Sequence, residues 1–294
     1  GSNKDIYNIY SIAFSVDAYV PDIQGLNQIA TINGEPATEN PTVQPGQEIE
    51  YTLDIRNLGT EEIENGKVII PIPFTATFVD ADFEVFFTSN TVKAPYFDPN
   101  LGATGSIVWE LGELPLLEDI NSILARITFK LKATEDCLIL SNPNCDAFIS
   151  VGGSISGKGK ISQSEFSGIQ LTQGFLDGDC EGEPIQTPLI IPIVGATEWA
   201  NANCGEVDLF DSFSFCNINP EEGIPFNSIA ISFPVGIRFF DGIDPNKSNE
   251  FTASNPFPAT SGTYFGIPVN SSNCIFEFKI EVSIVTTSPT VAEG

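Results

Sequence analysis

The stretch that decides the fold is Glu48-Ile-Glu-Tyr-Thr-Leu-Asp-Ile-Arg56, in which apolar and polar residues alternate. This period of two places the side chains at positions 49, 51, 53 and 55 on one face of a strand and leaves the other face in water. Similar alternation runs through residues 12–20, 125–131 and 276–284. The pattern predicts antiparallel sheets, each with one solvated face.

Turn residues lie between these segments. Asn65-Gly66 predicts a tight hairpin, and Asp177-Gly178 and Asp241-Gly242 predict further chain reversals. The only helical candidates are short, at residues 116–122 and 197–202. The chain carries 25 glycines and 21 prolines spread between the strands, which is typical of an all-β sandwich protein.

The length of 294 residues favours two domains. A boundary is predicted between residues 172 and 183, where glycine and charge are concentrated. We expect tandem antiparallel β-sandwiches at 1–176 and 177–294, with an N-terminal strand and with residues 134–172 as an elaboration of the first. Matches at an offset of 161 indicate an internal duplication: Pro73, Phe78 and Asp80 against Pro234, Phe239 and Asp241.

The composition and charge of the chain exclude several classes of function. The chain has 39 acidic and 12 basic residues, so its net charge is −27, which repels nucleic acid and anionic membranes. It has no histidine, which removes Ser-His and Cys-His catalysis. Its apolar runs fall short of a membrane span. Carboxylates are plentiful enough for a hydrolase, but nothing in the sequence ties two of them to a cleft, so we expect no enzyme.

Six cysteines, without a CxxC pair, favour disulfides over a zinc site and indicate an oxidising compartment. They are Cys137, Cys145, Cys180, Cys204, Cys216 and Cys274. Free buried thiols are the alternative. Pairing as 137–145, 180–204 and 216–274 is expected, because no such bond crosses the predicted domain boundary.

Two acidic sets are candidate calcium sites, since hard carboxylate oxygens bind this ion. The first is Asp177, Asp179, Glu181 and Glu183, and the second is Asp241, Asp244, Asn246 and Glu250. Neither has the spacing of an EF-hand, and the alternative is a solvated acidic turn. No other cofactor is expected.

Two tryptophans and two lysines are candidates for binding or cross-linking. Trp109 is in phase with Ile107 and Leu111 and is expected in the core, whereas Trp199 either covers a core edge or stacks on a sugar. Lys130 and Lys279 follow Phe in alternating strands, so both are expected to face water rather than to form a buried cross-link.

A resemblance rests on Asn40-Pro-Thr-Val-Gln-Pro-Gly-Gln-Glu-Ile-Glu-Tyr-Thr-Leu-Asp-Ile-Arg-Asn-Leu-Gly59, followed by the segments 68–73 and 106–114. These residues resemble the Ig-like repeats of large bacterial surface proteins. The continuation at 133–137, Gly174, 180–185 and 188–191 resembles adhesins that Bacteroidota export by the type IX system, including SprB-like gliding adhesins. The resemblance implies Ig-like sandwiches and a repetitive, non-catalytic role in cell adhesion or gliding motility at the cell surface.

The function expected is therefore that of an extracellular structural or adhesion module, with a carbohydrate-binding module as the alternative. The leading Gly1-Ser2 pair is typical of tag cleavage, and we expect an excised internal fragment that is monomeric. Its expected partners are neighbouring repeats of the same chain, surface glycans, a host or a substratum. The two domains are expected to form an elongated rod.

Overall fold

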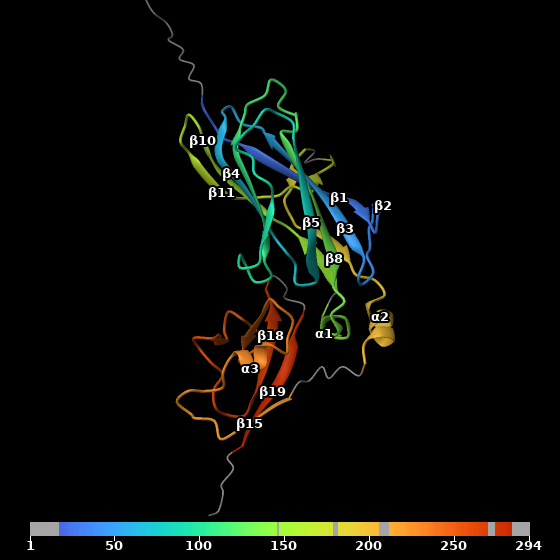
Figure 1. The fold of residues 1–294 in the computed structure, drawn as a ribbon, viewed down its shortest axis with the longest axis vertical. Coiled ribbons are helices and arrows are strands. Elements are labelled where there is room, and N and C mark those ends of the chain that lie inside the picture. Colours follow the sequence, from blue (N-terminus) through green and yellow to red (C-terminus); the bar gives the residue numbers. More distant parts are fainter. Residues whose placement is uncertain (1–17, 146, 179–181, 206–211, 270–273, 284–294) are drawn as a thin grey trace, which may run out of the picture.

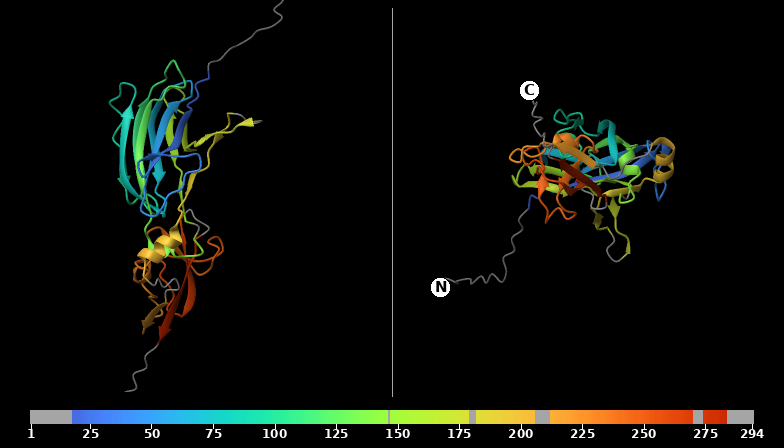
Figure 2. Two further views of the ribbon diagram at one scale, coloured as in Figure 1. Left: turned by 90° about the vertical axis from the view of Figure 1, so that its right-hand side faces the viewer. Right: turned by 90° about the horizontal axis from the view of Figure 1, so that it is seen from below.

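The computed structural model describes residues 18–145, 147–178, 182–205, 212–269 and 274–283. These residues form two units that lie end to end along the longest axis of the molecule (Figure 1). The described chain starts at the far end of the first unit and leaves at the far end of the second (Figures 1 and 2). The all-β class predicted from the alternation is confirmed, because strands dominate both units.

The first unit is a sandwich of two five-stranded sheets, which the side view in Figure 2 shows as layers. One sheet has the order β2-β1-β3-β8-β5 and the other has the order β11-β10-β4-β7-β6. The strands of the first sheet are β1 (Ile23–Ile32), β2 (Glu35–Pro36), β3 (Glu48–Asn57), β5 (Ala76–Val85) and β8 (Ala125–Ala133). Those of the second are β4 (Ile63–Pro71), β6 (Tyr96–Asp98), β7 (Ser106–Leu114), β10 (Ser154–Gly159) and β11 (Glu165–Gln170).

Strand β3 is central to this core. Its inward residues Ile49, Tyr51, Leu53 and Ile55 are all fully buried, as the period of two predicts. Gly46 enters the strand with a φ of 80°, and the side chain of Asn57 ends it by accepting a hydrogen bond from the Gly59 N–H at 3.0 Å. Turn chemistry on both sides therefore fixes the register that buries the odd positions.

Two small ribbons and two helices complete the first unit. The ribbons pair β12 (Gly174–Phe175) with β13 (Pro184–Ile185) and β9 (Phe148–Val151) with β14 (Leu189–Pro192). The helices are α1 (Cys137–Leu140) and α2 (Ala196–Asn203). Helix α2 confirms the helical turn expected at 197–202, whereas residues 116–122 form bends and a turn instead of a helix.

The second unit is one five-stranded sheet, β15-β19-β18-β16-β17, covered by α3 (Asn227–Ala230) and loops. Its strands are β15 (Ser212–Cys216), β16 (Ile237–Phe240), β17 (Glu250–Phe251), β18 (Gly262–Pro268) and β19 (Phe276–Ser283). Phe239, Phe257 and Phe278 fill the core with edge-to-face ring contacts. A second sheet, as in an Ig-like sandwich, is not found among the described residues of this unit.

The predicted domain boundary at 172–183 lies too early in the chain. Strand β14 pairs with β9, and Ile191, Ile193 and Ala200 are buried in the first core. The glycine-rich stretch instead turns the β12–β13 ribbon, with Gly178 at a φ of 84° and Gly182 at 85°. A turn and a linker have the same composition, and here the passage between the cores lies after Cys204.

The described strands of the two units do not show the predicted duplication. Strands β3 and β8 of the first unit pair antiparallel, but β15 and β19, which would correspond to them in a duplicated fold, pair parallel. The residues matched to Val68–Ile70 of β4 lie around α3 instead of in a strand. The shared residues reflect a phenylalanine-rich composition and similar turns.

Asn65-Gly66 does not form the predicted hairpin turn. Asn65 has the expected positive φ of 54°, but both residues lie inside β4, where the register against β7 shifts between Ile63 and Gly66. A left-handed residue that is inserted into a paired strand makes a bulge rather than a reversal. Of the alternating segment at 12–20, residues 12–17 lie outside the described chain, and residues 18–20 are not in a strand.

Candidate functional site

Two disulfides gather at the junction of the units. Cys137 at the start of α1 bonds Cys204 at the end of α2, with Cα atoms 5.8 Å apart. Cys145, which follows α1, bonds Cys274, which precedes β19. The second bond therefore joins the two units covalently.

The predicted pairing of 137–145, 180–204 and 216–274 is wrong. The Asp136 side chain caps α1 by accepting from the N–H groups of Leu138 and Ile139, and this short helix separates Cys137 from Cys145. Cys216 is a free, exposed thiol on β15, with its Sγ 3.4 Å from Ser283 Oγ. Cys180 lies outside the described residues.

Noncovalent contacts support the same junction. Ile139, Cys274 and Phe276 form a small buried cluster with Phe74 and Phe233 packed against it. Asn142 donates from Nδ2 to the carbonyl of Ile275 at 3.0 Å. Gly236 sits so close to Thr104 that an added Cβ would lie 2.5 Å from the threonine methyl group. The junction is thus a packed contact between the units.

The first acidic set is described only in part. Asp177 and Glu183 are exposed on either side of the β12–β13 turn, where the Leu176 N–H donates to the Glu183 carbonyl. Asp179 and Glu181 lie outside the described chain. In the described ranges no group of three or more His, Cys, Asp and Glu side chains is placed to hold a metal ion.

The second acidic set is engaged by protein partners. Asp241 accepts from the backbone and side chain of Asn249 at 2.8 and 2.7 Å. Lys247, aided by the backbone N–H of Asn246, lowers the pKa of Asp244. The bidentate Arg238 guanidinium likewise lowers the pKa of Glu250. These carboxylates stabilise the loop between β16 and β17 rather than pointing at a common centre.

The tryptophans and lysines lie as their phase predicts. Trp109 is fully buried, and its indole N–H donates to the Lys93 carbonyl at 3.0 Å. Trp199 of α2 is half-buried against the first core, so it covers a core edge. Lys279 is exposed, and Lys130 is partly exposed beside Glu50 and Asp80.

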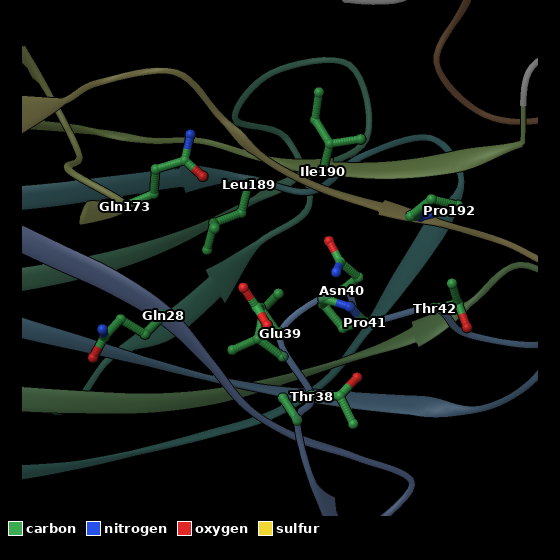
Figure 3. A pocket seen from close by; sticks show the side chains of 12 residues that line it. Gln28, Thr38, Glu39, Asn40, Pro41, Thr42, Gln173, Leu189, Ile190 and Pro192 are labelled. Atoms are coloured by element: carbon green, nitrogen blue, oxygen red, sulfur yellow. The ribbon is translucent and has the colours of Figure 1, made fainter. Parts of the chain in front are cut away.

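Sequence reasoning missed an open cavity of about 560 Å³ beside β1 and β14 (Figure 3). Its polar lining includes the amides of Gln28, Asn40 and Gln173, and its apolar lining includes Leu189 and Ile190. These residues come from three segments that are distant in sequence, so no spacing signal joins them. The one sequence hint is the apolar run at 189–194, of which Ile190 remains 58% exposed.

Comparisons with known proteins find only distant structural likenesses to this chain. No protein-family model and no curated protein match it. Among solved structures, the major pilin subunit of Bacillus cereus is 9% identical with a TM-score of 0.34, covering 90% of this chain and 70% of the pilin. The full-length major pilin SpaD of Corynebacterium diphtheriae is 8% identical with a TM-score of 0.35, covering 90% and 64%.

A cohesin module of a Clostridium perfringens family 33 glycoside hydrolase is 10% identical with a TM-score of 0.31, covering 58% of this chain and 98% of that module. Such low scores are insufficient to assign a function. The features that bear on function are therefore the strand pairing, the disulfides and the cavity of this chain.

Proposed function

We propose that this protein is an extracellular, non-catalytic structural module of a large cell-surface protein, in which two β units follow each other along one axis. The observation that carries this proposal is the junction: the units lie end to end, and the Cys145–Cys274 bond joins them across the contact (Figure 1). A structural module gains reach from such an arrangement, because each unit extends the axis. Stable disulfides are also typical of proteins outside the cytosol.

The chemistry of the described side chains supports the same proposal. The chain has no histidine, and the acidic side chains of the β16–β17 loop are paired within that loop. Trp199 packs on the core, so its position favours neither sugar stacking nor the carbohydrate-binding alternative. The finer assignment, an adhesin segment of the kind that Bacteroidota export by the type IX system for gliding, is part of the proposal and rests on the sequence resemblance.

Small-angle scattering on the monomeric, oxidised chain tests the structural role. A compact chain of this length has a radius of gyration of about 19 Å, and we expect a clearly larger value with the pair-distance profile of an elongated particle. The Cys216→Ser variant is the matched control and should give the same scattering profile, because this thiol is free and exposed. A profile typical of a compact particle near 19 Å would contradict the proposal.

A further inference from the structure

The cavity beside β1 lies between two strand edges that do not pair with each other. Strand β1 pairs with β2 and β3, and β14 pairs with β9. Residues of both strands line the cavity, namely Gln28 and Ile29 from β1 and Leu189, Ile190 and Pro192 from β14 (Figure 3). The space is therefore bordered by polypeptide backbone as well as by side chains.

Each edge presents an unpaired residue to this space. The N–H of Asn27 donates to Thr172 on the outer side of β1, so strand alternation turns the N–H of Ile29 to the same side, directly before the register shift between Ile29 and Thr31. The N–H of Ile193 donates to the carbonyl of Ala147, the residue directly before β9, so the backbone groups of Ile190 point away from β9. Among the described residues, no backbone hydrogen bond from the cavity side reaches Ile29 or Ile190.

Single residues already occupy the two ends of the space. Thr172 bridges to β1 by accepting from Asn27 and donating to Gly25, at 2.7 and 2.8 Å. At the other end, Val43 bridges to β14 by donating to Pro192 and accepting from Val194, at 3.0 and 2.8 Å. Both contacts have the form of parallel β-bridges. Between them, backbone that could pair with a strand is left open.

The lining favours a short, uncharged peptide over a sugar. Glu39 is the one charged residue among those that line the cavity, and none of them is aromatic. Three side-chain amides can bond peptide groups, and the exposed Ile190 offers an apolar contact. An extended peptide that adds to a strand edge binds through these two kinds of contact.

We propose that this cavity, named here the edge groove, binds residues 11–16 of a second copy of the chain as an added β-strand. In this segment Ile12, Phe14 and Val16 alternate with small residues, the pattern of a strand with one apolar face. The whole stretch from residue 6 to 16 carries no charge, although the chain has a net charge of −27. An uncharged segment can therefore approach an acidic surface without repulsion.

The C-terminal segment fits the edge groove less well, because Pro289 removes a backbone donor and Glu293 adds charge near Glu39.

Residues 11–16 of a second copy are favoured over the same residues of the same chain. Val20 is hydrogen-bonded to Thr60 near the start of β1, and Thr172 covers the outer edge of β1 before the groove is reached. Such a contact joins two different surfaces of the chain, so it would link copies into a ring if the rotation between them closes and into an open series if it does not.

Photo-cross-linking of the full chain tests this proposal. Phe14 is replaced by p-benzoylphenylalanine, copies labelled with nitrogen-14 and nitrogen-15 are mixed, and cross-linked peptides are mapped by mass spectrometry. We expect position 14 of one isotope to join residues 28–42 or 173–192 of the other. A synthetic peptide of residues 8–17 should compete and lower the yield.

Variants of the edge groove sharpen the result. Ile190→Asp should lower the cross-link yield at least tenfold, whereas Ile231→Asp, at an 86% exposed residue of the second unit, should leave it unchanged. Cross-links confined to one copy, cross-links elsewhere, or a yield that Ile190→Asp does not change would overturn the proposal. An elongated monomer without cross-links would overturn this proposal but leave the proposed structural role intact. The two proposals can therefore fail separately.

Discussion

Burial of the Tyr51 hydroxyl lowers the stability of the fold. Its hydroxyl is buried without a hydrogen-bond partner, and desolvation raises its pKa well above the ordinary value. Removing an unsatisfied polar atom and keeping the ring stacked on Phe129 should stabilise the fold. We expect Tyr51→Phe to increase the free energy of unfolding in urea by about 1 kcal/mol.

Tyr264→Phe is the matched control, because the Tyr264 hydroxyl is hydrogen-bonded to Thr260. This variant should lose stability where Tyr51→Phe gains it. Equal losses in both variants would show that the Tyr51 hydroxyl has a partner in solution.

Glu61 is a buried carboxylate that accepts hydrogen bonds from Ile161 N and Ser162 N at 2.6 and 2.9 Å and from Ser162 Oγ. Burial raises the pKa of Glu61, but these donors outweigh burial and lower the pKa below its ordinary 4.5. Its contribution to stability is therefore complete at neutral pH and is lost as the pH falls below 4.5, through the lowered pKa.

Glu61→Gln should consequently be less stable than the parent chain at pH 7, and the difference should shrink as the pH falls below 4.5. Urea titrations at several pH values measure this. Glu62→Gln is the control, since Glu62 is a partly exposed partner of Lys160 and should change little at any pH. A deficit in Glu61→Gln that is independent of pH would contradict the assignment.

At the scale of single residues, the sequence predicts which face of a strand is buried. It does not predict which polar residues are buried. Tyr51 and Trp109 were both in phase with a core face. Glu61 and Glu62, by contrast, are adjacent and chemically identical. The Ser162 that distinguishes them lies 101 residues from Glu61, and no local pattern carries information over that distance.

At the scale of elements, long periodic segments were predictable and short ones were not. The alternation in β3, β8 and β19 extends over at least eight residues in each strand, enough for a period of two to be distinct. Helices α1 and α3 have four residues each, about one turn, so no helical period can appear in them. The cysteine pairing depended on α1 and was missed with it.

The Cys137–Cys204 disulfide joins α1 to α2, and removing it tests how α2 is held against the first core. A Cys137→Ser/Cys204→Ser variant should lose about 2–5 kcal/mol of stability and let α2 move away from the first core. Trp199 would then become more accessible to acrylamide quenching, while Trp109 stays protected in the core. Cys216→Ser should change neither quenching nor stability, and an unchanged Trp199 signal in the double variant would show that packing alone holds α2.

At the scale of the whole molecule, the sequence predicted two units but misplaced the passage between them. Glycine and charge at residues 174–183 mark a ribbon turn, and the return of the chain through β14 and α2 to the first core is a long-range event. The edge groove was hidden for the same reason. Its lining depends on β1 and β14, which meet only after the chain has made this return.

The Cys145–Cys274 bond also determines how the molecule responds to tension. A pull between the two ends would run from the first unit into α1, across this bond and directly into β19, bypassing the 129 residues that separate the two cysteines. Most of the second unit and all of α2 would thus be shielded from stretching. Single-molecule force spectroscopy should show about 45 nm of additional contour length when both disulfides are reduced. Under oxidising conditions the chain acts as a shorter covalent tether with a folded side loop, and a reductant adds the 129 residues of that loop to the length that the same load can extend.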